Sequence, residues 1–257
     1  MHAPLAILWP MTSLDAVLFD LDDTLFSTTA FARRARANAV RAMVKAGLGL
    51  SEAVVQAELD EVIAEFSSNY DNHFDKLLQR LRPDALERIN PALIVAAGVA
   101  AYHDTKFKDL APFADVVPLL DALGNAGLVR GVITHGWTVK QAEKLVRLGL
   151  VPHLDANAVF ISDQIGISKP NPKLYQTALA DLGLEAPRVM YVGDNPLHDV
   201  APPAQVGMVT VWARRSARHD IEGTGARADH VVDDFEELAT ILRERYGVEM
   251  PPRLVEA

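Results

Sequence analysis

Six short segments of the chain are almost continuously apolar and rich in β-branched residues. They are residues 15–21 (DAVLFDL), 128–134 (LVRGVIT), 158–162 (AVFIS), 188–194 (RVMYVGD), 208–213 (MVTVWA) and 230–233 (HVVD). Parallel strands that are covered on both faces show this pattern, because neither face meets water. Stretches with helical periodicity separate most of them. The alternation predicts an α/β fold with a doubly wound parallel sheet.

Local signals indicate where two of the intervening helices begin and end. Thr138 followed by Gln141 predicts a capping box, in which both side chains bond to backbone at the start of a helix. In the stretch KPNPKLYQTALADLG, Asn171 fits the N-cap of a helix, Pro172 its first helical position and Gly183 its C-terminal cap.

The alternation of strand and helix stops between residues 31 and 111. This region contains only helical patterns, which lie at residues 30–47, 51–66, 72–81 and 91–103. Because it is too long for a loop, we interpret it as a small all-helical domain inserted after the first strand. The predicted division is therefore an α/β core, formed by residues 1–30 and 112–257, and a helical insertion at residues 31–111.

Composition excludes several classes of function. The formal net charge of −9 makes nucleic acids and anionic membrane surfaces poor partners, since both bind clustered Lys and Arg. The chain has no cysteine, so a disulfide, a thiol nucleophile and a thiolate metal site are all excluded. Any metal site must use oxygen or imidazole ligands.

The chain shows no sign of a membrane span or a signal peptide. No stretch approaches about 18 consecutive apolar residues, and the segment APLAILWP at residues 3–10 is short and lacks a basic flank. We therefore predict a cytoplasmic protein. Met11 stands just before the first predicted strand, so residues 1–10 are interpreted as an extension. An apolar face on the helical insertion would be compatible with a homodimer.

Charged and polar residues follow four of the predicted strands. In a strand, alternate side chains share a side, so Asp20 and Asp22 would lie on the same side, roughly 6 to 7 Å apart at Cα. The carboxyl ends of parallel strands meet at one edge of a sheet, where ligands bind in folds of this kind. The residues expected at this edge are Asp20, Asp22, Thr134, His135, Lys169, Asp194 and Asp199.

Several carboxylates at one edge would repel one another unless a cation holds them ionised. Mg²⁺ suits such a site, since it takes oxygen ligands, keeps waters and accepts a phosphate oxygen. Lys169 would add a second positive charge, able to neutralise a nucleophilic carboxylate or to bind phosphate. The pattern therefore indicates a magnesium site with a second positive charge beside it.

The order of these motifs resembles the haloacid dehalogenase superfamily of phosphatases. The motifs are D-x-D-x-T from Asp20, T-x-G from Thr134, K-P from Lys169 and G-D-x-x-x-x-D from Gly193. The resemblance implies a Rossmann-like core, and the helical insertion resembles the cap of that superfamily. The stretches at residues 19–48, 68–81, 96–107 and 139–150 are similar to a mainly archaeal branch of Mg²⁺-dependent phosphatases linked to glyceraldehyde 3-phosphate.

The resemblance implies a role for each acid. Asp20 would attack phosphorus and form an aspartyl-phosphate, and Asp22 would protonate the leaving alcohol and then activate water. Mg²⁺ would be held by the carboxylates of Asp20 and Asp194 and the backbone carbonyl of Asp22. Asp199 would order the waters of the metal or pair with Lys169.

The phosphoryl oxygens would be bound by the Thr134 hydroxyl, by Lys169 and by backbone N–H groups near Asp22 and His135. His135 stands where members of the superfamily usually have Asn or Asp. The substrate would be a small phosphorylated metabolite, such as a triose phosphate. Arg33 and His73 are the candidates in the insertion for contacting the substrate.

Three other functions are compatible with parts of this pattern. A 2-haloacid dehalogenase of the same superfamily would use Asp20 against carbon, but would need neither Asp22 nor a metal. A phosphomutase would need an intermediate that resists water. A phospho-receiver domain, which is not an enzyme, gathers similar residues but would be about half as long and would lack the insertion.

Overall fold

The computed structural model describes residues 13–66, 70–81 and 89–255, so the N-terminal extension expected at residues 1–10 lies outside the described residues. The chain divides into two compact units, one formed by Met1–Ser27 and Ala111–Ala257 and the other by Thr28–Leu110. The sequence analysis placed the two boundaries at residues 30/31 and 111/112. The first helix of the second unit begins at Thr28.

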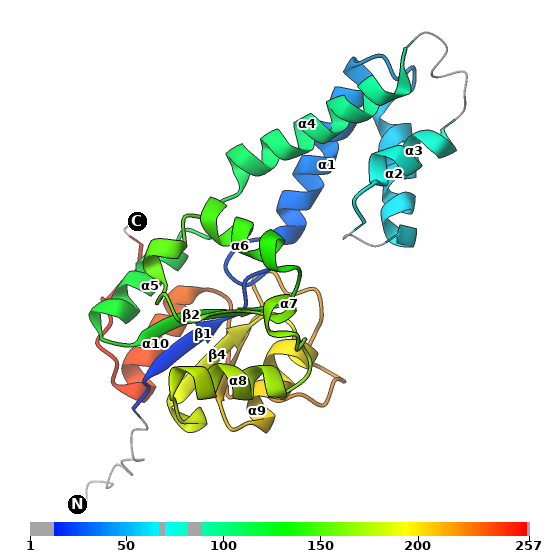
Figure 1. The fold of residues 1–257 in the computed structure, drawn as a ribbon. Coiled ribbons are helices and arrows are strands. Elements are labelled where there is room, and N and C mark those ends of the chain that lie inside the picture. Colours follow the sequence, from blue (N-terminus) through cyan, green and yellow to red (C-terminus); the bar gives the residue numbers. More distant parts are fainter. Residues whose placement is uncertain (1–12, 67–69, 82–88, 256–257) are drawn as a thin grey trace, which may run out of the picture. The chain divides into compact units, whose positions relative to one another are not determined.

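A six-stranded sheet forms the centre of the first unit, and all its strands are parallel (Figure 1). Its strands are β1 (Ala16–Phe19), β2 (Val129–Thr134), β3 (Val159–Ile161), β4 (Val189–Gly193), β5 (Val209–Ala213) and β6 (His230–Val232). Their order across the sheet is β3-β2-β1-β4-β5-β6. The chain thus moves outward from β1 in one direction and then in the other, which confirms the predicted doubly wound sheet.

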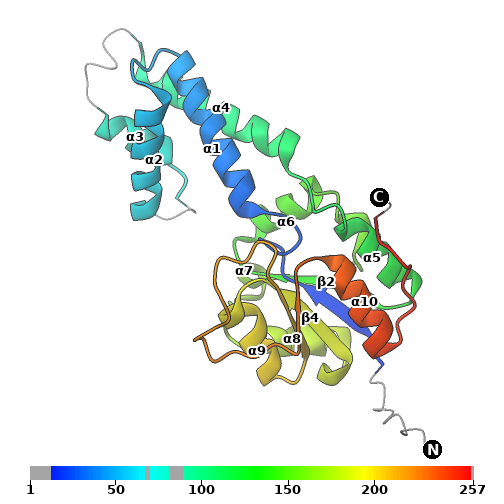
Figure 2. The same cartoon turned by 180° about the vertical axis from the view of Figure 1, so that it is seen from behind.

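Helices cover both faces of this sheet (Figures 1 and 2). They are α5 (Val116–Asn125), α6 (Thr138–Arg147), α7 (Ser162–Ile165), α8 (Lys173–Leu182), α9 (Ala201–Gln205) and α10 (Phe235–Tyr246), with short turns η2 (Val151–His153), η3 (Ala186–Arg188) and η4 (Pro196–Val200). Leu18 packs in one apolar cluster with Tyr175 of α8. Phe19, the next residue of β1, meets Phe235 of α10 edge-on at 5.8 Å between ring centroids. Because neighbouring strand residues face opposite ways, β1 is buried on both sides.

The capping box predicted at the start of α6 is wrong. The N-cap residue is Trp137, and Thr138 instead donates its hydroxyl to the carboxylate of Asp163, 2.7 Å away. The Gln141 side chain turns toward the carboxyl ends of the strands. For α8 the predicted end is confirmed, because Gly183 closes the helix with a φ of 65°. The predicted start is one residue too early: the N-cap is Pro172, and the Asn171 side chain accepts the N–H of Lys173 at 3.0 Å.

The second unit is entirely helical in its described residues. It consists of α1 (Thr28–Lys45), α2 (Glu52–Phe66), α3 (His73–Arg80) and α4 (Pro91–Asp109). Its apolar core includes Met43, Leu59, Leu77 and Ile94, each with no exposed surface. A Cβ at Gly98 of α4 would lie 2.8 Å from the Met43 side chain, so glycine lets α1 and α4 approach closely. No helix in the described parts of either unit has the length and apolar character to cross a membrane.

A partly buried ion pair joins three segments of the first unit. The carboxylate of Asp115 accepts a hydrogen bond from Nη1 of Arg215 at 2.8 Å, a second from Nη2 of the same guanidinium, and one from the backbone N–H of Phe235 at 2.9 Å. Burial alone would raise the pKa of Asp115, but these hydrogen bonds outweigh it and hold the pKa below its usual value. The pair therefore ties the start of α5 to the loop after β5 and the start of α10.

We predict that Asp115→Asn destabilises the first unit at neutral pH by about 1 to 2 kcal/mol, because a charged, hydrogen-bonded acceptor is lost. The lowered pKa means that Asp115 stabilises the fold above its unfolded-state pKa of about 3.9, and that this contribution disappears as the pH falls through the lower folded-state pKa. The difference in Tm between wild type and variant should therefore shrink between pH 5 and pH 2.

The matched control is Asp233→Asn, which removes a similar carboxylate paired with Arg214, but at a site where both side chains are about half exposed. It should change Tm little. A pH-independent difference for Asp115→Asn, or an equal loss in both variants, would contradict the prediction.

Candidate active site

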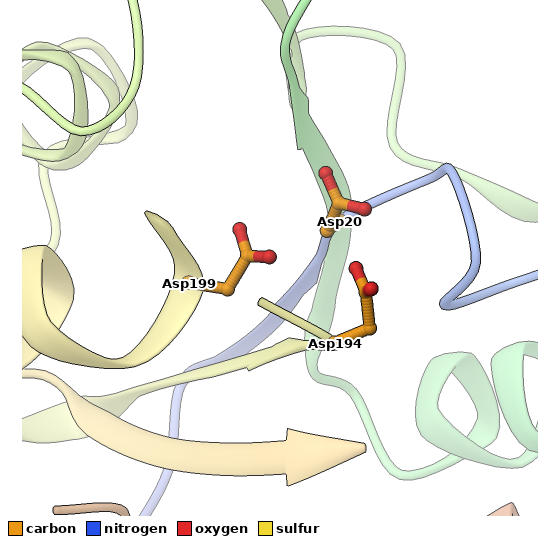
Figure 3. A group of neighbouring side chains, drawn as sticks. All are labelled: Asp20, Asp194 and Asp199. Carbon is orange, nitrogen blue, oxygen red and sulfur yellow. The ribbon is translucent and has the colours of Figure 1, made fainter. Parts of the chain in front are cut away.

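Three carboxylates point toward one another at the carboxyl edge of the sheet (Figure 3). Asp20 directly follows β1, and its N–H donates to the carbonyl of Val192 in β4 at 2.8 Å, so the backbone is still held by the sheet. Asp194 directly follows β4, and Asp199 lies in η4. All three are buried, and their nearest carboxylate oxygens lie within 4.8 Å of one another. The structure thus brings together three of the acids that the sequence placed at this edge.

The ammonium of Lys169 lies between two of these acids. Its Nζ donates to Oδ1 of Asp20 and to Oδ1 of Asp199, each at 2.6 Å, and to the hydroxyl of Tyr191 at 2.8 Å. A lysine ammonium has three protons, and these three partners use them all. In this arrangement Lys169 orders the carboxylates, and a direct bond from it to a phosphate would require it to exchange one partner.

Tyr191 was not singled out by the sequence analysis. It lies inside β4 with no exposed surface, and its hydroxyl donates to the carbonyl of Ile133 at 2.9 Å while accepting from Lys169. A polar tip on a buried aromatic residue needs such partners. The only sequence signal was a tyrosine within the apolar run RVMYVGD, which looks like an ordinary strand residue.

The backbone between β4 and α9 fixes Asp199. The N–H of Asn195 donates to Oδ2 of Asp199 at 3.0 Å, while Asp199 returns its own N–H to the carbonyl of Asn195 at 2.6 Å. A Cβ on Gly193 would lie only 2.3 Å from the Cβ of Asp199, so this position requires glycine. Pro202 is accommodated because it falls in the first turn of α9, where its missing N–H costs no helical bond.

The site carries more negative charge than its lysine neutralises. Burial raises the pKa of Asp20 to about 7, although Lys169 opposes the rise, and burial with the charges of Asp20 and Asp199 raises the pKa of Asp194 to about 8. For Lys169, burial alone would lower the pKa, but Asp199 and Asp20 outweigh it and raise the pKa above its usual value.

The donor set fits a divalent cation. No group in the described residues donates a hydrogen bond to the carboxylate of Asp194, although this side chain is buried beside two other acids. Carboxylate oxygens without thiolate or imidazole neighbours are the ligands of hard cations. A cation here would offset the repulsion that raises the pKa values of Asp20 and Asp194.

The side chain of Asp22 is bound by two residues of α6. Both its carboxylate oxygens accept from Nζ of Lys144 at 2.6 Å, and Oδ2 also accepts from Nε2 of Gln141 at 3.2 Å. The sequence analysis missed both donors. The buried hydroxyl of Thr134 is 3.4 Å from Oε1 of Gln141, so Thr134 and Asp22 share this one glutamine.

The remaining predicted residues fall into two groups. His135 is exposed at the end of β2, with its Nδ1 2.7 Å from the hydroxyl of Ser168. Arg33 and His73 belong to the helical unit: Arg33 is exposed on α1, and His73 begins α3 with its ring 5.5 Å from that of Tyr70. The substrate contacts proposed for all three stay predictions.

The sequence matches the family model described as haloacid dehalogenase-like hydrolase over residues 17–213. This span holds the strands from β1 to β5, the helical unit and every candidate site residue.

Curated relatives match over most of the chain. The glyceraldehyde 3-phosphate phosphatase of Methanopyrus kandleri is 44% identical over 238 residues, which cover 90% of this chain and 98% of that protein. The enzyme of the same name from Methanocaldococcus jannaschii is 35% identical, with coverage of 90% and 97%. The crystal structure of a haloacid dehalogenase-superfamily phosphatase from Thermococcus onnurineus is similar with a TM-score of 0.61 and 26% identity, covering 93% of this chain and all of that one.

We predict that a divalent cation raises the Tm of the wild type and has a much smaller effect on Asp194→Asn. A ligand that binds only the folded state stabilises it by mass action, by about 2.7 kcal/mol at 100 times Kd. Thermal unfolding with and without MgCl₂ measures the shift. Asp181→Asn, which removes one exposed carboxylate from α8, is the charge-matched control and should respond like the wild type. Equal shifts in all three proteins would place the cation elsewhere.

Proposed function

The chain belongs to the haloacid dehalogenase-like hydrolases and is a phosphatase, and from this premise we propose that it hydrolyses glyceraldehyde 3-phosphate or a similar small phosphate monoester with Mg²⁺. The substrate is supported by relatives of that name at 44% and 35% identity. The observation that carries the chemistry is the buried carboxylate of Asp20, fixed by Lys169 beside Asp194 and Asp199.

In the first step, a carboxylate oxygen of Asp20 attacks phosphorus as the bond from phosphorus to the ester oxygen breaks. Lys169 holds Oδ1 of Asp20, and the hydroxyl of Thr24 lies 3.4 Å from Oδ2, so the nucleophile is already oriented. The leaving oxygen takes a proton from the carboxyl group of Asp22. The products of this step are the free alcohol and an aspartyl-phosphate on Asp20.

In the second step, the carboxylate of Asp22 takes a proton from water, and the oxygen of that water attacks phosphorus. The bond between phosphorus and Asp20 breaks, which releases inorganic phosphate and restores the carboxylate. Asp22 ends the cycle protonated, as it began, so the protons balance. One residue thus serves as acid and then as base.

The Mg²⁺ ion would be held by the carboxylates of Asp20 and Asp194 and the backbone carbonyl of Asp22. When bound, it supplies positive charge to the phosphoryl oxygens and to the crowded carboxylates. Asp199 would act at a distance, by fixing Lys169 at 2.6 Å. The Thr134 hydroxyl and the backbone N–H of His135 would bind phosphoryl oxygens.

The phosphatase relatives decide among the functions that the sequence left open. A 2-haloacid dehalogenase and a phosphomutase are set aside because relatives at 35–44% identity, over about 90% of the chain, are phosphatases. The receiver domain is set aside because the match to the hydrolase family, over residues 17–213, extends across the helical unit. A cytoplasmic location and a homodimer stay predictions.

The proposed covalent mechanism predicts that Asp20→Asn abolishes phosphate release and leaves the fold intact. The amide keeps the size of the side chain but cannot attack phosphorus. Phosphate release from glyceraldehyde 3-phosphate and from p-nitrophenyl phosphate, each with and without Mg²⁺, measures the activity. BeF₃⁻, which mimics an aspartyl-phosphate, should bind the wild type and not the variant. Substantial activity in a folded Asp20→Asn would refute the covalent mechanism.

Substrate selectivity is proposed to reside in the helical unit, at Arg33 and His73. Replacing either with Ala should lower kcat/KM for glyceraldehyde 3-phosphate more than for p-nitrophenyl phosphate, because only a fitted substrate uses specific binding energy. Arg36, which is partly buried on the same helix as Arg33, provides a partly matched control. Equal losses on both substrates, or none, would show that neither residue selects the substrate.

A further inference from the structure

Both carboxylate oxygens of Asp22 are bound by side chains of one helix. Nζ of Lys144 lies 2.6 Å from each oxygen, and Nε2 of Gln141 lies 3.2 Å from Oδ2. Gln141 and Lys144 are three residues apart in α6, so they share a face of the helix. Lys144 and Asp22 are partly buried, with side-chain exposures of 21% and 27%.

Gln141 also ties Asp22 to the residues that follow β2. Its Nε2 donates to the carbonyl of His135 at 2.8 Å, and its Oε1 lies 3.4 Å from the hydroxyl of Thr134. Gly136 makes room for this arrangement, because a Cβ there would lie 2.5 Å from Nε2 of Gln141. The Gln141 amide thus connects two residues of the proposed mechanism. Its nitrogen bonds to Asp22, the general acid and base, and its oxygen bonds to Thr134, which would bind phosphate.

The start of α6 is itself fixed. Both the backbone N–H and the hydroxyl of Thr138 donate to Oδ2 of Asp163, at 2.9 and 2.7 Å, and Asp163 lies in α7 after β3. Two strand ends, those of β2 and β3, therefore hold the helix that carries Gln141 and Lys144. This anchoring makes α6 a rigid support for the side chain of Asp22, which lies on the loop after β1.

We propose that Lys144, assisted by Gln141, is a positioning residue that orients the Asp22 side chain for its two proton transfers. When Asp22 is protonated for the first transfer, the oxygen that carries the proton gives up its bond to Lys144 and the other oxygen keeps it. The proposal rests on the proposed function, in which Asp22 serves the leaving oxygen and then the water. Without Lys144, the Asp22 side chain would sample several rotamers, and a displacement of about 1 Å can cost about 100-fold in rate. Lys144 does not touch the substrate in this role.

A purely structural ion pair is the competing explanation, and leaving groups distinguish the two. p-Nitrophenolate leaves without a proton, whereas the alkoxide of glyceraldehyde 3-phosphate needs one. Lys144→Met should therefore slow formation of the aspartyl-phosphate from the sugar phosphate by about 10 to 100-fold, and leave the burst of p-nitrophenolate nearly unchanged. Hydrolysis of the aspartyl-phosphate should slow with both substrates, because Asp22 also activates water.

Rapid-quench measurements of the first turnover with both substrates test this, alongside two further variants. Lys144→Arg, which keeps a donor to both oxygens, should recover part of the lost rate. Lys140→Met removes another lysine of the same helix, one whose Nζ lies 4.3 Å from the centre of the Trp137 ring, and it should behave like the wild type. Gln141→Met should show the Lys144→Met pattern more weakly.

Three results would overturn the proposal. The first is that Lys144→Met matches Lys140→Met in every step. The second is that it slows the p-nitrophenolate burst as much as the reaction of the sugar phosphate. The third is that Lys144→Arg is no faster than Lys144→Met. Absence of any phosphoenzyme in an active wild type would overturn the proposed function, and this proposal with it. A normal phosphoenzyme in the wild type combined with unchanged kinetics in Lys144→Met would overturn only the role of Lys144.

Discussion

The site depends on two ion pairs of one ammonium group, from Lys169 to Asp20 and from Lys169 to Asp199. Three buried carboxylates cannot stay ionised at one edge of a sheet at neutral pH without positive charge nearby. The Lys169 ammonium is the positive charge that the protein itself places there. Its third bond, to Tyr191, anchors it to the sheet through the carbonyl of Ile133. Lys169 is thereby held by a tyrosine of β4 and by two acids. A cation bound at the site would supply the remaining neutralisation.

The parallel sheet makes this arrangement possible, because β1 and β4 are neighbours that end at the same level. Phe19 pairs in register with Val192, so Asp20 and Asp194 emerge close to one another from adjacent strands. Each strand is buried on both faces, which fixes its register and prevents the acids from drifting. Apolar packing therefore fixes the positions of the acids, in particular the packing of Leu18 against α8 and of Phe19 against α10.

The sequence was sufficient to predict the six strands, the helical insertion and the grouping of Asp20, Lys169, Asp194 and Asp199, because each of these depends on patterns local to a strand and its end. It could not reveal Tyr191, whose hydroxyl gains a partner only when the fold brings Lys169, 22 positions away, next to it. Nor could it show that Asp22 is bound from α6, across 122 positions of chain. Side-chain partners of this kind are set by tertiary packing, which no local periodicity encodes.

Gln141 shows why such residues are misassigned. By local rules, Thr138 and Gln141 should cap α6, and each would satisfy backbone donors there. The structure gives both side chains other partners: Thr138 bonds to Asp163, and Gln141 bonds to Asp22 and the carbonyl of His135. The helix gives up a local cap, worth about 1 kcal/mol, and the amide gains buried bonds at the active site. A position where a strong local preference is overridden in this way is where a functional constraint is to be expected. The override at Gln141 is therefore consistent with the proposed role of α6 in positioning Asp22.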